Sequence, residues 1–249
     1  MTPSAVVAFP GHMPDFRAAR DRCAHACARY NSLGKDTPPE LRTAAWNSIT
    51  TAVLGPLPTN NQDTGIDTAP ATPVDGPQTS PWSISEPTQA PEVKAPVLID
   101  YGVRLYIHPT VFINYNCIIL DTPVVDLCIG AETMIGPNCT LVTVSHSIDP
   151  DVRSLAMKGL CRTKHSTGSA ITIGARVWLG SNVTVLPGVT IGDGCVIGAG
   201  SVVTKSIDAG WLAFGNPAKP VRLVHGYDKT PDWEVFTLEQ ALGFKGHVI

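Results

Sequence analysis

The residue best suited to acid-base chemistry is His146, in the segment LVTVSHSIDP. The ordinary pKa of histidine lies near 6.5, so an imidazole can take a proton from a poor nucleophile such as a hydroxyl at neutral pH. His146 also stands where a long irregular segment begins, and such loops often carry function. A single histidine at a loop junction is nevertheless more often a hydrogen-bonded structural residue. We expect His108 and His165 to be surface residues.

Seven cysteines are candidates for nucleophiles or metal ligands, and they lie at positions 23, 27, 117, 128, 139, 161 and 195. Their odd number and scattered spacing are not those of a disulfide framework or a zinc site. To carry an acyl group, Cys117 or Cys139 would need a paired base, and their places in the repeat described below favour packing. We therefore expect reduced thiols, no metal and a cytoplasmic protein.

The elements that position such residues follow from a six-residue period. Aliphatic side chains recur at Ile173, Leu179, Val185, Ile191, Ile197 and Val203. A step of six scatters side chains around a helix, but in extended segments an even step keeps them on one face. Compact residues follow four places after the members of this run and suit a narrow interior; they are Val177, Val183, Val189, Cys195 and Ser201. Fixed self-similarity of this kind is typical of a repeat architecture.

The same period occurs upstream, first at Ile107, Ile113, Ile119 and Val125 and then, after a shortened step, at Ile129, Ile135 and Leu141. Three hexads make one triangular turn, so the pattern predicts a mainly β fold. The expected form is a left-handed parallel β-helix, which departs from the usual right-handed crossover. Glycines together with Asn138 and Asn182 stand where the corners of such a coil need a permissive backbone.

Composition limits the class of protein. The chain has 249 residues, 43% of them hydrophobic, and can bury a sizeable core. A net charge of −3 without a basic block argues against nucleic acid or an anionic membrane as a partner. The first residues lack a basic leader and a long apolar region, so we expect no signal peptide, and no segment long enough to cross a membrane occurs.

Four segments are expected along the chain. Residues 10–55 are predicted to form a helical cap, with one helix from Asp15 to Tyr30 and a second, striped by Leu41 and Ile49, that stops at Gly55. Residues 56–95 are a proline-rich linker. Residues 96–225 are predicted to form the β-helix, with a loop at 147–170 that projects from it. Residues 226–249 are expected to form a capping tail with a short C-terminal helix, because solenoid ends need covering.

Three passages carry a family resemblance: DYGVRLYIHPTVFINYNCIILD, ITIGARVWLGSNVTVLPGVTIGDGCVIGAGSVVTK and GNPAKPVR. They closely resemble the sugar O-acetyltransferases of the hexapeptide-repeat superfamily, the maltose and galactoside acetyltransferase group. The helical pair resembles the N-terminal cap of that group. The resemblance implies that the protein is an acyltransferase and a homotrimer. It implies that acetyl-CoA binds between neighbouring prisms and that the acetyl group moves directly to a hydroxyl of a sugar or other small molecule.

The resemblance also implies residue roles. His146 matches the catalytic base, and the backbone N–H of Ser181 is the candidate donor to the oxyanion. The cofactor-binding positions map onto Trp178, Gly180, Ser181, Ala199, Thr204, Lys205, Lys219 and Arg222, whose three cations suit the phosphates of CoA. The acceptor-binding positions map onto Asp100 and Asn114.

On the acceptor side the chain departs from that group. That group has an acidic residue just after the position of Asp121, where this chain has Thr122. Near its start that group has an aromatic residue followed by an acid that binds the acceptor, where this chain has Phe9-Pro10. Because two carboxylates that would hold sugar hydroxyls are missing, a hydroxylated specialised metabolite is as good an acceptor candidate as a sugar. Asp121 itself is expected to close a corner of the coil.

Two other functions are compatible with a β-helix. The first is an inactive scaffold or ligand-binding protein, which would not need His146, Trp178, Lys205 and the GNPAK segment together. The second is a zinc hydratase of the carbonic anhydrase type, which needs three convergent histidines. Only His146 is suitably placed for that role.

Overall fold

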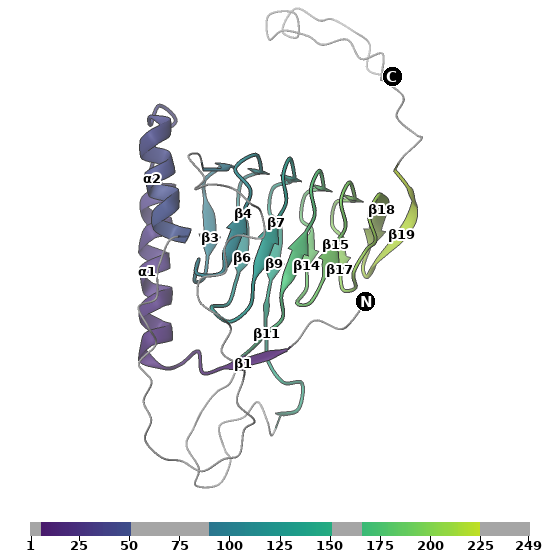
Figure 1. The fold of residues 1–249 in the computed structure, drawn as a ribbon, viewed down its shortest axis with the longest axis horizontal. Coiled ribbons are helices and arrows are strands. Elements are labelled where there is room, and N and C mark those ends of the chain that lie inside the picture. The colour runs from purple at the N-terminus through teal and green to yellow at the C-terminus, as the bar shows by residue number, and fades with distance from the viewer. Residues whose placement is uncertain (1–5, 51–89, 151–165, 225–249) are drawn as a thin grey trace, which may run out of the picture.

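The computed structural model describes residues 6–50, 90–150 and 166–224. Short strands coil into a three-sided prism, and a pair of helices stands against its N-terminal end (Figure 1). The predicted mainly β fold, a left-handed parallel β-helix with N-terminal helices, is confirmed. The short helix predicted near the C-terminus, with the rest of residues 226–249, lies outside the described residues.

Each coil adds one strand to each of three faces, which we number in the order in which the chain visits them. Face 1 contains β4 (Leu105–Ile107), β7 (Leu127–Ile129), β12 (Ile171–Ile173) and β15 (Thr190–Ile191). Face 2 contains β2 (Glu92–Val93), β5 (Phe112–Ile113), β8 (Met134–Ile135), β13 (Trp178–Leu179), β16 (Val196–Ile197), β18 (Trp211–Gly215) and β19 (Ala218–Leu223). Face 3 contains β3 (Val97–Ile99), β6 (Cys117–Leu120), β9 (Thr140–Val142), β14 (Thr184–Val185) and β17 (Val202–Val203).

All ladders within the prism are parallel except that of β18 with β19. The period-six residues stack in register inside the prism, as when Leu179 lies between Ile135 and Ile197. All six members of the strongest run, from Ile173 to Val203, are 0% exposed, and the compact residues that follow them are buried as well. The six-residue period therefore predicted the core correctly.

The prism has three edges, named here by the faces they join. At edge 2–3 the corners are hydrogen-bonded to one another: the N–H of Asn182 donates to the carbonyl of Pro137 (2.9 Å) and that of Gly200 to Ser181 (2.8 Å). Asn138 and Asn182 have φ of 60° and 58°, in the left-handed region that asparagine tolerates. This confirms their predicted place at corners.

The upstream period differs from its prediction at Val125. That residue is buried, but it lies in the turn before β7 rather than in a strand. The corner after β6 extends over residues 121–126, so Leu127 and Ile129 take the inward places on face 1. At the other end, β2 already pairs with β5, and the prism starts at Glu92, within the segment predicted as linker.

The helical pair consists of α1 (Pro14–Asn31) and α2 (Pro39–Thr50), and α1 lies along β3. Tyr30 and Trp46 are buried between the helices, with ring centroids 5.7 Å apart in an edge-on arrangement. Leu41 is 59% exposed, so its predicted place in the buried stripe is wrong. Ile49 is buried as predicted, and together with Trp46, whose indole packs against Tyr30, it forms the buried face of α2.

The cysteines pack as small apolar groups. Cys23 and Cys27 are buried on α1 and direct their thiols at the carbonyl oxygen of Ile99 (3.3 and 3.8 Å). Inside the prism the thiol of Cys139 donates to the carbonyl of Gly180 (3.1 Å). The six described cysteines are unpaired, while Cys161 lies outside the described residues.

Candidate active site

A small antiparallel sheet beside the prism carries His146. It contains β1 (Val7–Phe9), β11 (Ser166–Gly168) and β10 (Val144–Ser145), in the order β1-β11-β10. Phe9 pairs with Ser166 of β11, and His146 follows the last residue of β10 at the same end of the sheet. The His146 side chain is exposed, and its imidazole has no hydrogen-bond partner among residues 6–50, 90–150 and 166–224. The ring is therefore accessible to another molecule.

Phe9 anchors this small sheet to the prism. Its side chain is 2% exposed, and its ring centroid lies 5.6 Å from that of Phe16 and 6.3 Å, edge-on, from that of Tyr101. Val144 of β10 packs against the same cluster. The sequence did not predict β1, because its only signal is a short apolar run closed by Pro10. The cluster links the strand that carries His146 to the corner after β3.

Asp100 lies in that corner and is held by α1. Its Oδ1 is 3.0 Å from Nε of Arg20, and Nη2 of Arg20 donates to Oη of Tyr101 (2.6 Å). The guanidinium also lies over the Tyr101 ring, 4.9 Å from its centroid. Burial raises the pKa of Asp100, and the Arg20 charge opposes that rise. Arg20 and Tyr101 were not predicted as site residues, since nothing local marks one arginine among the several on α1.

Asp121 closes the next corner, as expected. Its carboxylate accepts hydrogen bonds from the backbone N–H groups of Asp100 (3.1 Å), Tyr101 (2.8 Å) and Gly102 (2.7 Å). It is 1% exposed, and burial raises its pKa to about 6 against the lowering effect of the N–H donors. Thr122 is fully buried beside it, so this position faces the interior rather than a ligand.

The predicted site residues lie on different parts of the prism. Edge 3–1, which follows face 3, carries Asp100, His146, Thr204 and Lys205. Edge 2–3 carries Asn114, Gly180, Ser181 and Ala199. The predicted base and the predicted oxyanion donor thus belong to different edges of one chain. A site that uses both needs the corresponding edge of a second copy.

Close stacking of coils shapes edge 2–3. A Cβ on Gly180 would lie 2.7 Å from the backbone nitrogen of Ala199, so glycine is needed there for the coils to pack. The backbone N–H of Ser181 donates no hydrogen bond within the described part of the chain, although its carbonyl accepts one from Gly200. The Asn114 side chain accepts a hydrogen bond from the N–H of Tyr115 (2.8 Å).

Trp178 and the three predicted cations are exposed. Trp178 points outward from face 2 with 55% of its surface exposed, directly beside Met134, which is 53% exposed. Lys205 follows β17, and β19, which carries Lys219 and Arg222, lies against β17. The cations therefore occupy neighbouring elements at the C-terminal end of the prism.

Two further observations concern the described residues alone. No group of three or more His, Cys, Asp and Glu side chains is placed there to hold a metal ion. Neither α1 nor α2 is long and apolar enough to cross a membrane.

Parts of the chain are similar in sequence to known proteins. Residues 170–205 match the family described as bacterial transferase hexapeptide (six repeats). Galactoside O-acetyltransferase of Escherichia coli is 35% identical over 150 residues, which are 60% of this chain and 69% of that enzyme. A Schizosaccharomyces pombe protein is 42% identical over 141 residues, and nodulation protein L of Rhizobium meliloti is 39% identical over 127. The aligned segments span 63% and 64% of these two relatives.

Solved structures extend the likeness to most of the chain. A maltose O-acetyltransferase from Clostridium difficile superposes with a TM-score of 0.65 at 26% identity, covering 88% of this chain and 92% of that one. A galactoside acetyltransferase in complex with coenzyme A shares the fold, with a TM-score of 0.62 at 24% identity and coverage of 92% and 94%. These features define a hexapeptide-repeat transferase. Within that class, the chain belongs to the acetyltransferase family that includes the maltose and galactoside enzymes.

Proposed function

We propose that this protein is an acetyl-CoA-dependent O-acetyltransferase that moves an acetyl group directly to a hydroxyl of a small molecule. The observation that carries the proposal is the position of His146, which is exposed on the edge that also holds Asp100 and whose ring has no hydrogen-bond partner among the described residues. A general base must reach its substrate from such a position. The family membership supports the same reaction class.

In the proposed reaction His146 takes the proton of the acceptor hydroxyl while the hydroxyl oxygen forms a bond to the acetyl carbonyl carbon of acetyl-CoA. The backbone N–H of Ser181 donates to the carbonyl oxygen as negative charge develops there. The C–S bond then breaks, and His146 returns the proton to the sulfur of CoA. Atoms and charge balance without an acyl-enzyme, and loss of a positioned base typically slows such a step about a hundredfold to ten-thousandfold.

The donor side of the proposal rests on exposed groups of the correct chemistry. Lys205, Lys219 and Arg222 can contact the phosphates of CoA from the last coils of the prism. Ala199 on edge 2–3 and Thr204 on edge 3–1 are exposed small residues that would leave room for the pantetheine arm between two copies. Trp178 is proposed to line the groove between two copies in which CoA binds.

We further propose a homotrimer whose sites lie between copies. Edge 3–1 of one copy carries His146 and Asp100, and edge 2–3 of its neighbour supplies Ser181, Ala199 and Asn114. Head-to-tail contacts of this kind close into a ring when the rotation allows. The outward apolar stripe of face 2, which includes Met134 and Trp178, supports burial in such an assembly. A cytoplasmic location, expected from the unpaired cysteines, is part of the proposal.

The test is thiol release from acetyl-CoA by wild-type protein and the His146→Ala variant against a panel of hydroxylated acceptors, with product masses recorded. A product heavier by one acetyl group with wild type, and at least about a hundredfold slower formation with the variant, would support the proposal. His108→Ala is the matched control, because the His108 ring is half-buried and bonded to Thr110 at another edge.

Binding separates the alternatives. If acetyl-CoA binds but no acceptor is acetylated, the donor side holds and the base assignment has no support. If acetyl-CoA does not bind either, the inactive scaffold becomes the better description.

A further inference from the structure

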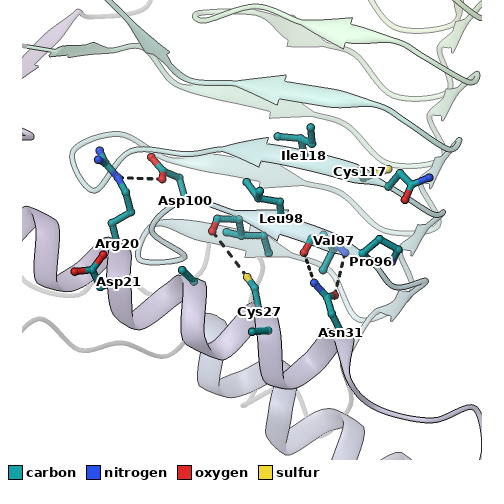
Figure 2. Close-up of a pocket in the computed structure, with 14 residues that line it drawn as sticks. Arg20, Asp21, Cys27, Asn31, Pro96, Val97, Leu98, Asp100, Cys117 and Ile118 are labelled. Atoms are coloured by element: carbon teal, nitrogen blue, oxygen red, sulfur yellow. Dashed lines mark hydrogen bonds and ion pairs between the residues drawn. The ribbon is translucent and has the colours of Figure 1, made fainter.

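A groove of about 600 Å³ lies between α1 and face 3, next to the Arg20 and Asp100 ion pair (Figure 2). This volume is within the range of small-molecule sites. One wall is the exposed side of α1, and the floor is the outward side of β3 and β6. Of the predicted site residues only Asp100 lines it, so the groove is not explained by the roles assigned so far.

The floor of the groove is apolar. Leu98 and Ile118 are direct neighbours in the parallel register of β3 and β6, and they are 50% and 37% exposed. Ala24 and Ala28 of α1 face the groove from the wall. Covering such a concave surface with an apolar ligand is favourable by about 25 cal/mol for each Å² removed from water.

The two ends of the groove differ in charge: Arg20, Asp21 and Asp100 line one end, and the neutral amides of Asn31 and Asn116 line the other. At edge 3–1, Oδ1 of Asp100 binds Arg20, whereas Oδ2 has no hydrogen-bond partner among the residues that the structure describes. At the opposite end the Asn31 side chain is satisfied, since it donates to the carbonyl of Val97 (2.9 Å) and accepts from its N–H (3.0 Å). Asp100 therefore offers a hydroxyl group an acceptor that Asn31 does not.

We infer that the groove binds the acceptor and that the acceptor is amphiphilic, with a hydroxyl-bearing head at Asp100 and an apolar body over Leu98 and Ile118. The inference rests on the proposed acetyltransferase function. The floor runs along β3 from Pro96 to Asp100, about 13 Å at the usual rise of a strand. The head end lies on the edge that carries His146.

Other occupants fit the groove less well. A plain saccharide over Leu98 and Ile118 would leave hydroxyls without partners, which is costly. The apolar surface of a second copy would have to cover the half-buried pair of Arg20 and Asp100 and remove both charges from water. An amphiphile satisfies both parts of the groove at once.

The experiment compares octyl glucoside, below its micelle concentration, with methyl glucoside as probes. Calorimetric binding to the wild-type protein should be at least about tenfold tighter for the octyl compound, because only its tail reaches the floor. In the double variant Leu98→Ser/Ile118→Ser this gain should disappear, while binding of methyl glucoside and of acetyl-CoA stays unchanged. Leu41→Ser, which alters an exposed leucine of α2 outside the groove, is the control and should keep the gain.

Three results would overturn the inference. The octyl chain gives no gain in affinity, the gain survives in the double variant, or the double variant dissociates the assembly in light scattering. The last result would assign the groove to contacts between copies. Turnover is scored separately, so a tail-dependent gain in affinity without His146-dependent acetylation would reject the enzyme function and not the groove as a binding site.

Discussion

The ring of Phe9 packs edge-on against the ring of Tyr101, with 6.3 Å between their centroids. This contact joins β1, and through β11 the strand that carries His146, to the corner beside Asp100. The proposed base and the proposed acceptor-binding carboxylate are thus linked by one aromatic cluster. We therefore expect β1 to help position His146.

Truncation of Phe9 should loosen the small sheet. In Phe9→Ala the buried ring is lost, β10 and β11 should exchange their amide hydrogens faster, and kcat should fall about tenfold to a hundredfold because His146 is no longer held in place. The KM for acetyl-CoA should not change. Val6→Ala, which alters a residue that is 68% exposed, is the control. Unchanged exchange in β10 together with a lower kcat would contradict the positioning role.

Removal of Arg20 should weaken acceptor binding and shift its pH dependence. Arg20 lowers the pKa of Asp100 against the effect of burial, so Arg20→Ala should raise that pKa further. If the ionised Asp100 binds the acceptor hydroxyl, the acid limb of kcat/KM for the acceptor moves to higher pH. The measurement is kcat/KM between pH 4 and 8, compared with Arg29→Ala in the last turn of α1. Identical acid limbs would remove Asp100 from the acceptor site.

Asp121 should make stability depend on pH. Its pKa is raised from 3.8 to about 6 in the folded state, so its contribution is fully present below about pH 4 and is lost as pH rises through 6. The free energy of unfolding of wild type relative to Asp121→Asn should therefore fall by up to about 3 kcal/mol between pH 4 and 7. Urea unfolding of both proteins across this range measures it, and a constant difference would show that the N–H donors offset the burial.

Mixed assemblies should test whether a site uses two edges. His146→Ala inactivates edge 3–1, and Ala199→Trp obstructs edge 2–3 at an exposed position. Each variant alone should be inactive, but co-expressed chains that mix at random should recover about a quarter of wild-type activity, because some contacts join two intact edges. A mixture of two His146→Ala chains with different tags is the control. No recovery in mixed assemblies would indicate a site within one chain.

A methyl group at position 180 should strain the prism. In Gly180→Ala the new Cβ would lie 2.7 Å from the backbone nitrogen of Ala199, and a shift of the next coil should cost about 1–3 kcal/mol. Gly34→Ala is the matched control, since no heavy atom lies within 4 Å of the added Cβ. Thermal unfolding of both variants gives the comparison. Equal melting temperatures would mean that the corner adapts freely.

The prism could be predicted because its signals are local and repeated. Each hexad repeats the same pattern of residues, so the period alone identifies Leu179 and Ile197 as core residues. The same pattern identifies Asn182 as a corner residue. The six-residue pattern fails at the extended corner of residues 121–126, where Val125 lies in a turn rather than in a strand. A repeat thus predicts its own core well and its irregular turns poorly.

The acceptor side could not be predicted in the same way. Strand β1 pairs with β11 across most of the chain, and no local pattern connects Phe9 with Ser166. The role of Arg20 depends on the rotation of α1 against β3, which brings its guanidinium to Asp100. Tertiary packing of this kind leaves no mark in spacing or composition.

The excursion that carries His146 leaves the prism after β9 and returns at β12, and the coils on either side stay in register. Ile171 at its return still pairs with Leu127 of the preceding coil. This junction is therefore an insertion point that the solenoid tolerates without repacking. Under the proposed function, His146 belongs to this excursion whereas Ser181 and Lys205 belong to the regular coils. We therefore expect changes to the excursion to alter acetylation of the acceptor and to leave acetyl-CoA binding unchanged.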